Sequence, residues 1–296
     1  MTNIMEKQFY RQRKDFDLSC IERDKKFTMP EGVEYTENIV YTKDGNPSHQ
    51  LDIYRPKDRE GEVLPVIINV HGGGLIIGNK GFNKYFCSLL CKKGFLVYSI
   101  EYRLIPDCLM YDQISDVYMA MDYIKERLAA DGGDSSHVYM AGDSGGACLI
   151  TYANAIQNST NIARAANVTP SGLRINALGL ISGMFYTSRF DKIGLFLPKY
   201  LYGRDYKKTS FAKYVNPENR ELLNSLAPVW LVTSHNDFLR RYTTDFEKAL
   251  TRAEREHELV VFPKNKKLTH AFSVFEPFLP ESSEVIDMMV KYLRKF

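Results

Sequence analysis

No run of apolar residues in this 296-residue sequence is long enough to cross a membrane. Residues 1–28 are charged throughout and lack the apolar centre of a signal peptide, so we expect a cytoplasmic protein. An excess of either charge is also missing, because 39 basic and 36 acidic residues leave a formal net charge of only +3. We therefore expect neither a membrane partner nor a nucleic-acid partner.

Cysteine is scarce, with five residues in an irregularly spaced set. Cys87 and Cys91 lie four residues apart on a predicted helix and could supply half of a metal site, but no second pair and no nearby histidine completes it. We expect buried or half-buried thiols, and neither a metal nor a cofactor. Internal repeats, low-complexity tracts and interdomain linkers are absent as well, and the length suits one large α/β domain or two small ones.

Strand and helix patterns alternate from about residue 34 to the end of the chain. Residues 34–42 and 50–54 predict an antiparallel pair, joined by a turn at residues 43–47. Six buried strands are predicted further on, at residues 65–70, 96–101, 137–141, 175–181, 228–233 and 258–262. Helices are predicted between most of them, at residues 82–93, 113–129, 145–157, 242–255 and 283–295. This alternation predicts an α/β fold with a mostly parallel, eight-stranded sheet and helices on both faces.

Two segments do not fit the alternation. Residues 1–33 carry aromatic and charged side chains at loosely helical spacing, and residues 184–226 form an aromatic connection that is long for a compact domain. Because such long connections are more often functional than passive, we expect both segments to form a helical cap over the active site. The alternative is an ordinary packing layer of aromatic helices. The remaining residues, 34–183 and 227–296, are then the core of the fold.

Two glycine-rich signatures each follow a predicted strand. Residues 71–74 read HGGG, and residues 142–146 read GDSGG and open onto a predicted helix. The pattern G-x-S-x-G between a strand and a helix is typical of a nucleophile elbow, a strained turn that presents the serine hydroxyl, which here belongs to Ser144. A loop with several glycines supplies backbone N–H groups that can bind an oxyanion. Together the two signatures indicate acyl transfer.

These segments resemble the hormone-sensitive-lipase-like group of α/β-hydrolase esterases. The matches are HGGG with Gly78 following it, residues 101–107 (EYRLIPD, similar to the group's YRLAPE), and the elbow GDSGG, similar to GDSAGG. The segment 270–272 (HAF) is similar to the group's HGF, with alanine in place of glycine. The resemblance runs from residue 71 to about residue 272, in the group's order. It implies an α/β-hydrolase fold and a preference for small or short-chain esters.

A serine nucleophile needs a base and an acid, and in this fold the acid precedes the histidine. His270 lies in a loop between the last predicted strand and the last helix, where the fold delivers its base, whereas His257 ends a charged helix and is interpreted as solvated. Asp237 follows the strand at 228–233, and the next carboxylate, Asp245, lies within a helix. We predict Ser144, Asp237 and His270 as the catalytic triad. A structural histidine and a surface carboxylate are the alternatives.

The backbone N–H groups of three glycines are predicted to form the oxyanion hole, because glycine lets the main chain approach the reacting oxygen: Gly73, Gly74 and Gly145. Five neighbouring residues are expected to support the site structurally: His71, Gly72, Gly142, Asp143 and Gly146. Glu101, Tyr102 and Arg103 are expected to form a polar cluster beneath it.

The sequence thus predicts a serine carboxylic-ester hydrolase that acts on a small-molecule ester without metal or cofactor. Acetylated sugars and phenolic esters fit the expectation equally well. Two alternatives stay open: a catalytically silent hydrolase-fold receptor for a small molecule, and an amidase that uses the same triad. Whether the protein forms a homodimer also stays open.

Overall fold

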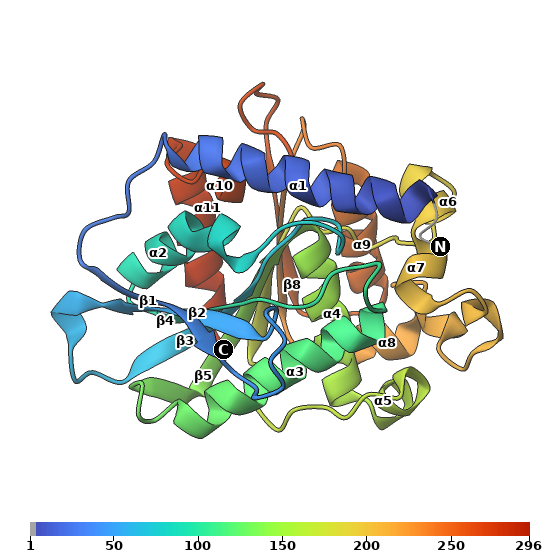
Figure 1. Ribbon diagram of the computed structural model, residues 1–296, viewed down its shortest axis with the longest axis horizontal. Helices are drawn as coiled ribbons and strands as arrows, with labels where there is room; N and C mark the ends of the chain where they lie inside the picture. Colours follow the sequence, from blue (N-terminus) through green and yellow to red (C-terminus); the bar gives the residue numbers. More distant parts are fainter. Residues whose placement is uncertain (1–3) are drawn as a thin grey trace.

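Eight strands form one sheet through the centre of the computed structural model, which describes residues 4–296 (Figure 1). Their bounds are β1 Val33–Val40, β2 Gln50–Pro56, β3 Leu64–Val70, β4 Leu96–Ile100, β5 Gly133–Asp143, β6 Ala177–Ile181, β7 Val229–Ser234 and β8 His257–Phe262. In space the strands follow the order β1-β2-β4-β3-β5-β6-β7-β8. The predicted α/β fold with an eight-stranded sheet is confirmed.

The sheet is mostly parallel, as predicted. β2 pairs antiparallel with both β1 and β4, and every other neighbouring pair is parallel. All residues of β4, β6 and β7 are buried, as expected for strands that are covered on both faces. Val70 at the end of β3 lies opposite Gly142 near the end of β5, so this register brings the two glycine-rich signatures side by side.

Helices cover both faces of the sheet. One face packs against α2 (Lys84–Lys92) and α11 (Pro280–Leu293), and the other against α3 (Met110–Arg127), α4 (Ser144–Asn158) and α9 (Arg240–Arg252). These are the five predicted helices, with ends that differ by a few residues. Proline at the first position starts α11 three residues earlier than predicted, because proline favours the first helical turn. Short helices follow at α5 (Thr160–Ala166), α8 (Arg220–Asn224) and α10 (Phe272–Phe275).

The two segments predicted as a cap lie against each other. The helix α1 (Ile4–Asp24) runs along the top of the molecule in Figure 1, towards the short helices α6 (Lys192–Phe196) and α7 (Pro198–Tyr202). The ring of Phe9 on α1 packs edge-on against Tyr200 on α7, with centroids 5.1 Å apart. Residues 1–3 of the predicted segment 1–33 lie outside the described residues.

One arginine of α1 also reaches the loop after β3. Arg13 donates a hydrogen bond from Nε to the carbonyl of Ile76 at 2.7 Å and another from Nη2 to the carbonyl of Ile105 at 2.5 Å. Its Nη1 forms an ion pair with Asp107 at 2.7 Å. The N-terminal helix is therefore attached to the segment that follows the first glycine signature.

The cysteines carry free thiols. Four of them are buried and Cys108 is half-buried, as predicted. Burial raises the pKa of Cys148 to about 12, so this thiol stays protonated at neutral pH. Among residues 4–296, no helix combines the length and the apolar character that crossing a bilayer requires.

A fully buried carboxylate joins α3 to the segment after β4. Asp116 accepts hydrogen bonds from the backbone N–H of Arg103 at 2.9 Å and from the Arg103 guanidinium, with the shortest contact at 2.7 Å. The Arg103 side chain is 30% exposed. The Arg103 side chain therefore pairs with α3, whereas the cluster predicted beneath the site also included Glu101 and Tyr102.

We expect Asp116→Ala to lower the free energy of unfolding by about 3 kcal/mol, because it removes a buried acceptor from a charged donor. Asp122→Ala on the same helix, where the side chain is exposed, should change it by less than about 0.5 kcal/mol. Urea unfolding of both variants beside the wild type measures the difference. Equal effects of the two substitutions would contradict a role for the Asp116 ion pair.

Candidate active site

Three side chains meet at the carboxyl edge of the sheet. Ser144 follows β5, Asp237 lies three residues after β7, and His270 lies between β8 and α10. The carboxyl ends of parallel strands share one edge, so residues far apart in the sequence come together there. His270 Nε2 lies 2.9 Å from Ser144 Oγ, and His270 Nδ1 lies 2.7 Å from Asp237 Oδ1. The structure thus brings together all three residues that were predicted as the triad.

Ser144 occupies a strained turn between β5 and α4. Its φ is +48°, in the left-handed region that non-glycine residues seldom adopt. A Cβ on Gly146 would overlap the carbonyl oxygen of Val70, and one on Gly142 would lie 2.9 Å from the carbonyl carbon of Gly146. Only glycine fits these two positions, so Gly142 and Gly146 support the turn as expected.

Asp237 is held by more than the histidine. Its Oδ2 accepts a hydrogen bond from Thr233 Oγ1 at 2.9 Å, and its Oδ1 accepts one from the backbone N–H of Leu239 at 2.8 Å. Burial by itself raises the pKa of Asp237, but the hydrogen bond and charge of His270 outweigh it, so the pKa lies below its usual value. Thr233 was missed because nothing in the sequence distinguishes it from other residues of β7.

The loop that carries His270 is held in place by a hydrogen bond of the next residue, Ala271. Ala271 has a φ of +48° and donates its N–H to Ser182 Oγ at 3.1 Å. A left-handed backbone at this position explains why the resembling group has glycine there. The ring of Phe238 lies 4.4 Å from the His270 ring, and Phe238 is 75% exposed. Phe238 thus places an exposed aromatic ring beside the imidazole.

Two other histidines are not part of this arrangement. His257, which the sequence analysis interpreted as solvated at a helix end, begins β8 instead, and its Nδ1 bonds the carbonyl of Arg255 at 2.7 Å. That interpretation is wrong because α9 already ends at Arg252. His235 lies near Asp237 in the sequence, but its Nδ1 contacts Arg240.

The first glycine signature forms a tight loop beside the elbow. Gly73 and Gly74 have φ values of +108° and +62°, and a Cβ on Gly73 would overlap the carbonyl oxygen of Ile77. A Cβ on Gly145 would lie 2.8 Å from the backbone nitrogen of Gly74. Within residues 4–296, nothing accepts a hydrogen bond from the N–H of Gly73 or Gly74. These donors therefore stay available next to the elbow.

His71 holds the beginning of this loop. Its Nε2 lies 2.9 Å from Glu101 Oε1, and its ring stacks on Tyr102 with centroids 4.4 Å apart. Tyr102 Oη also donates to the carbonyl of His71 at 2.8 Å. Burial lowers the pKa of His71, but the charge of Glu101 outweighs it, and the pKa is raised. His71, which was expected to support the site, thus contacts two residues of the predicted polar cluster, Glu101 and Tyr102.

Asp143 connects the elbow to the glycine loop. Its Oδ1 accepts hydrogen bonds from the N–H of Gly72 and from Asn83 Nδ2, both at 3.0 Å. Burial raises the pKa of Asp143, although Asn83 and the two nearby histidines oppose the shift. A Cβ on Gly72 would overlap this carboxylate. Asp143 and Gly72, both expected to support the site, are thus hydrogen-bonded to each other, and Asn83, which the sequence did not indicate, joins them.

Residues 67–273 match the family described by the alpha/beta hydrolase fold, and this match covers more than half of the chain. The chain belongs to the α/β-hydrolase family. The predicted resemblance to the hormone-sensitive-lipase-like esterases is confirmed with it. Within residues 4–296 of this α/β hydrolase, no group of three or more His, Cys, Asp or Glu side chains could hold a metal ion.

Curated relatives of this α/β hydrolase include plant methylesterases. It is 36% identical over 110 residues to a probable isoprenylcysteine alpha-carbonyl methylesterase of Oryza sativa subsp. japonica. This matched region covers 37% of this chain and 25% of that protein. It is 25% identical over 269 residues to the isoprenylcysteine alpha-carbonyl methylesterase of Arabidopsis thaliana. Here the matched region covers 86% of this chain and 61% of that protein. The chain thus spans less than two thirds of the length of these relatives.

Solved structures show the same fold. Esterase B from Lactobacillus rhamnosis has a TM-score of 0.91 and 22% identity, with 98% of this chain and 94% of that chain covered. The hyperthermophilic esterase from Pyrobaculum calidifontis has a TM-score of 0.72 and 22% identity, with 97% and 93% covered.

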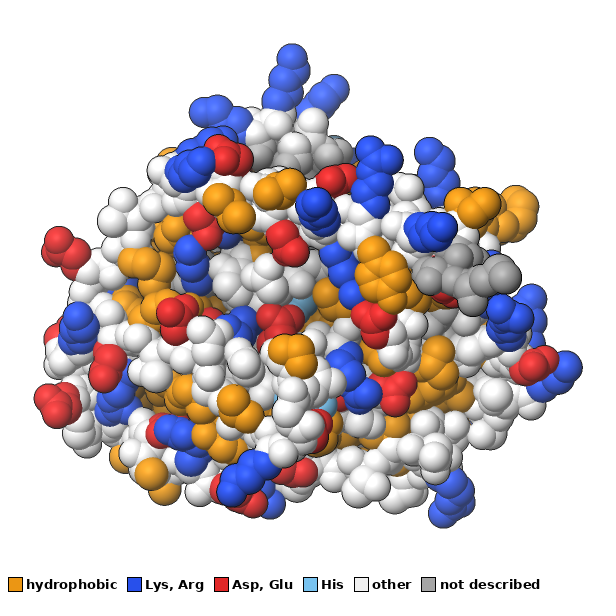
Figure 2. Space-filling view, in the orientation of Figure 1, with side chains coloured by type: hydrophobic (Ala, Val, Ile, Leu, Met, Phe, Trp, Pro, Cys, Tyr) orange, Lys and Arg blue, Asp and Glu red, His pale blue; other side chains and the backbone are white. Residues whose placement is uncertain are grey.

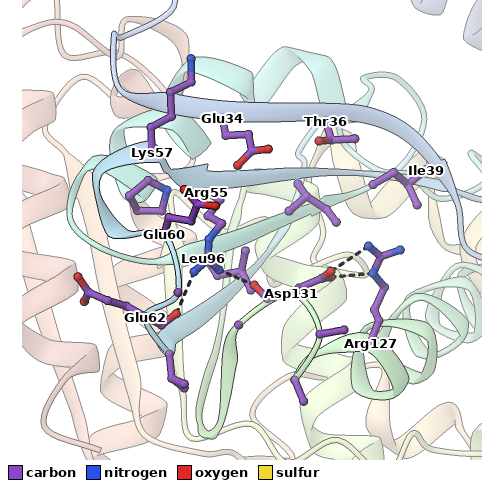
Figure 3. Close-up of a pocket in the computed structure, with 17 residues that line it drawn as sticks. Glu34, Thr36, Ile39, Arg55, Lys57, Glu60, Glu62, Leu96, Arg127 and Asp131 are labelled. Atoms are coloured by element: carbon purple, nitrogen blue, oxygen red, sulfur yellow. Dashed lines mark hydrogen bonds and ion pairs between the residues drawn. The ribbon is translucent and has the colours of Figure 1, made fainter.

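A polar hollow of about 810 Å³ lies at the opposite edge of the sheet from the triad (Figure 3). It is lined by Leu96 at the start of β4 and by the segment 129–132 before β5, so it opens at the amino ends of parallel strands. Arg127 pairs with Asp131 there at 2.7 Å, and Arg55 donates to main-chain carbonyls, among them that of Glu62. These charges hold loops together, and none of the triad residues lines the hollow.

The lowered pKa of Asp237 predicts a pH-dependent contribution to stability. A carboxylate whose folded pKa is depressed stabilises the fold fully above its unfolded value of about 3.9, and this contribution is lost as the pH falls through the folded pKa. We expect Asp237→Asn to lower the free energy of unfolding at pH 7 by more than it does at pH 3. Urea unfolding of both proteins at the two pH values measures this difference, and a constant difference would contradict the shift.

Proposed function

We propose that the protein is a serine carboxylic-ester hydrolase. The proposal depends on one observation above all, the continuous hydrogen-bonded row from Ser144 through His270 to Asp237, with distances of 2.9 and 2.7 Å. Such a row activates a hydroxyl for attack on a carbonyl carbon. The named esterases among its relatives and the family membership support the same reaction class.

The triad residues have distinct roles in this mechanism. Ser144 Oγ attacks the ester carbonyl while His270 Nε2 accepts its proton. Asp237 accepts the hydrogen bond from His270 Nδ1, which selects the tautomer with a basic Nε2 and stabilises the imidazolium that forms. The ionised state of Asp237 suits this role, because its pKa lies below the usual value. His270 then protonates the leaving alcohol, and water hydrolyses the acyl-enzyme with the same histidine as base.

The backbone of the two glycine segments provides the oxyanion hole in this proposal. The N–H groups of Gly73, Gly74 and Gly145 are assigned to the tetrahedral oxyanion. Support comes from the closeness of the two segments, since a Cβ added to Gly145 would lie 2.8 Å from the nitrogen of Gly74. The N–H groups of Gly73 and Gly74 also have no internal acceptor among residues 4–296. Donors that are already in place lower the cost of forming the charge, which is why such a site accelerates the reaction.

Small or short-chain esters are the proposed substrates. We assign residues 4–33 and 184–226 to a cap over the site, a role supported by the contact of Phe9 with Tyr200 and by the attachment of Arg13 to the loop after β3. The exposed ring of Phe238 beside His270 offers an apolar surface for a bound ester. A relative from Dothistroma septosporum is named a versiconal hemiacetal acetate esterase, and a crystal structure of esterase B describes inhibition by a tributyrin phosphonate.

We expect the protein to hydrolyse p-nitrophenyl esters with a rate that falls as the acyl chain lengthens from acetyl to palmitoyl. Ser144→Ala should lower kcat by about 10⁴-fold or more with the fold intact, because it removes the nucleophile. Steady-state kinetics with each ester, beside circular dichroism of both proteins, make the measurement.

A variant that keeps more than a tenth of the wild-type rate would remove Ser144 from the mechanism. A folded wild-type protein that hydrolyses none of the esters but binds small esters would favour the silent receptor. Hydrolysis of p-nitroanilides, the amides that correspond to these esters, at rates above those of the esters would favour the amidase.

We expect Gly74→Ala to lower kcat by about 10²-fold, because a methyl group and the altered backbone displace an N–H from the oxyanion. A Cβ at Gly74 would have only the sulfur of Met184 within 4.0 Å, so the variant has room to fold. The matched control is Gly45→Ala, whose φ of +77° gives a similar backbone strain and whose Cβ would meet no atom within 4 Å. Kinetics that are equally reduced in both variants would show a general effect of strain and contradict the assignment.

A further inference from the structure

The segment 189–213, which is part of the predicted cap segment 184–226, carries an excess of positive charge. It contains seven Lys or Arg residues and two Asp residues, a net charge of +5, whereas the whole chain carries only +3. The rest of the protein therefore has a net charge of −2. We call the surface of this segment the basic aromatic face.

Large apolar side chains protrude from the same face. Phe190 is 92% exposed, Leu195 57% and Phe196 50%, although the neighbouring Leu197 is buried. Ile4 at the start of α1 is 88% exposed. Hydrophobic side chains stand out over α6 in Figure 2, with Lys and Arg side chains around them. Exposing two phenylalanines and a leucine on one short segment is costly in water, which indicates a surface with a partner.

Four cations of this face have no acidic partner. Lys192, Lys199, Arg204 and Lys207 form no ion pair within residues 4–296, whereas Arg189, Lys208 and Lys213 do. A hollow of about 510 Å³ is lined by three of the four, Lys199, Arg204 and Lys207, together with the apolar side chains of Leu195, Pro198 and Tyr206. Asp205 lines it as well, but its charge is paired with Lys208 at 2.9 Å. This combination suits an anionic group that is attached to an apolar body.

The face is fixed to the body of the protein. Tyr242 Oη on α9 donates to Asp191 Oδ2 at 2.6 Å, and Arg189 pairs with Asp245 at 2.9 Å. Asp191 also caps α6 by accepting the N–H of Ile193 at 3.0 Å. These contacts hold α6 in place, so the exposed side chains are presented by an anchored element.

We propose that the basic aromatic face attaches the protein to a lipid surface with anionic headgroups. Aromatic side chains insert at the level of the headgroups, and Lys and Arg are attracted by the negative surface potential. A second copy of this chain does not suit the face, because a two-fold contact would place +5 against +5. The lack of an apolar span, which led us to expect no membrane partner, does not bear on attachment from one side.

The test measures flotation of the full chain with vesicles, using Ser144→Ala so that no lipid ester is hydrolysed. We expect binding to vesicles of phosphatidylcholine with phosphatidylglycerol and weak binding to pure phosphatidylcholine. Raising the salt from 0.1 M to 1 M shortens the Debye length from about 10 Å to about 3 Å and should weaken the binding strongly. Because the readout is binding, it is independent of whether the proposed ester hydrolysis is correct.

Two sets of variants distinguish binding by this face from a general effect of the protein's net charge. Lys199→Gln/Arg204→Gln/Lys207→Gln should weaken the affinity for anionic vesicles about 100-fold, at roughly fivefold for each charge. The matched control, Lys264→Gln/Lys266→Gln/Lys267→Gln, removes three exposed lysines from another loop and should weaken it less than threefold. Phe190→Ser/Phe196→Ser should weaken binding about tenfold or more, whereas Val40→Ser/Val63→Ser, which replaces apolar residues with exposures of 51% and 68%, should not.

Thermal unfolding of every variant checks that it is folded. The proposal is overturned if the wild-type surface does not bind anionic vesicles at 0.1 M salt, which would instead favour an acidic protein as the occupant. It is equally overturned if the triple variant of Lys199, Arg204 and Lys207 and the control triple variant at residues 264–267 bind anionic vesicles with equally reduced affinity. Net charge alone would then explain the binding.

Discussion

The close approach of two main-chain segments, at the end of β3 and the start of α4, determines the geometry of the whole site. The pairing of Val70 with Gly142 delivers them to the same place, and a Cβ on Gly145 or Gly146 would overlap or crowd the facing backbone. Because the contact lies between backbones, the sheet fixes it independently of side-chain rotamers. The donors next to Ser144 are therefore positioned before any ligand arrives.

Buried polar groups then stabilise this approach. Asp143 binds the N–H of Gly72 from the elbow side, and Glu101 binds both His71 and the backbone N–H of Lys80. Among residues 4–296, neither carboxylate leaves a buried oxygen without a partner, which is the condition for such a group to support a structure. The opposed pKa shifts of Asp143 and Asp237 follow from the same balance: burial dominates for Asp143, and the adjacent imidazole dominates for Asp237.

The sequence predicted the sheet, and the three side chains that the structure brings together at its edge, because both depend on local patterns. Buried strands are short continuous apolar runs, and amphipathic helices repeat their apolar side chains every three or four residues. Ser144, Asp237 and His270 each follow the end of a strand. Thr233 and Asn83 could not be predicted, because their roles depend on which side chains face each other after folding. His257 was misplaced because the boundary between α9 and β8 falls within a charged stretch where neither period is visible.

Arg13 has a consequence for how the first helix and the glycine loop are related. It holds the carbonyls of Ile76 and Ile105, and the N–H of Ile76 in turn donates to the carbonyl of Gly73 at 3.1 Å. The first helix and the glycine donors therefore belong to one hydrogen-bonded chain. Moving α1 away from this loop would break the hydrogen bonds of Arg13, so the position of the first helix and the conformation of the glycine loop are mechanically coupled.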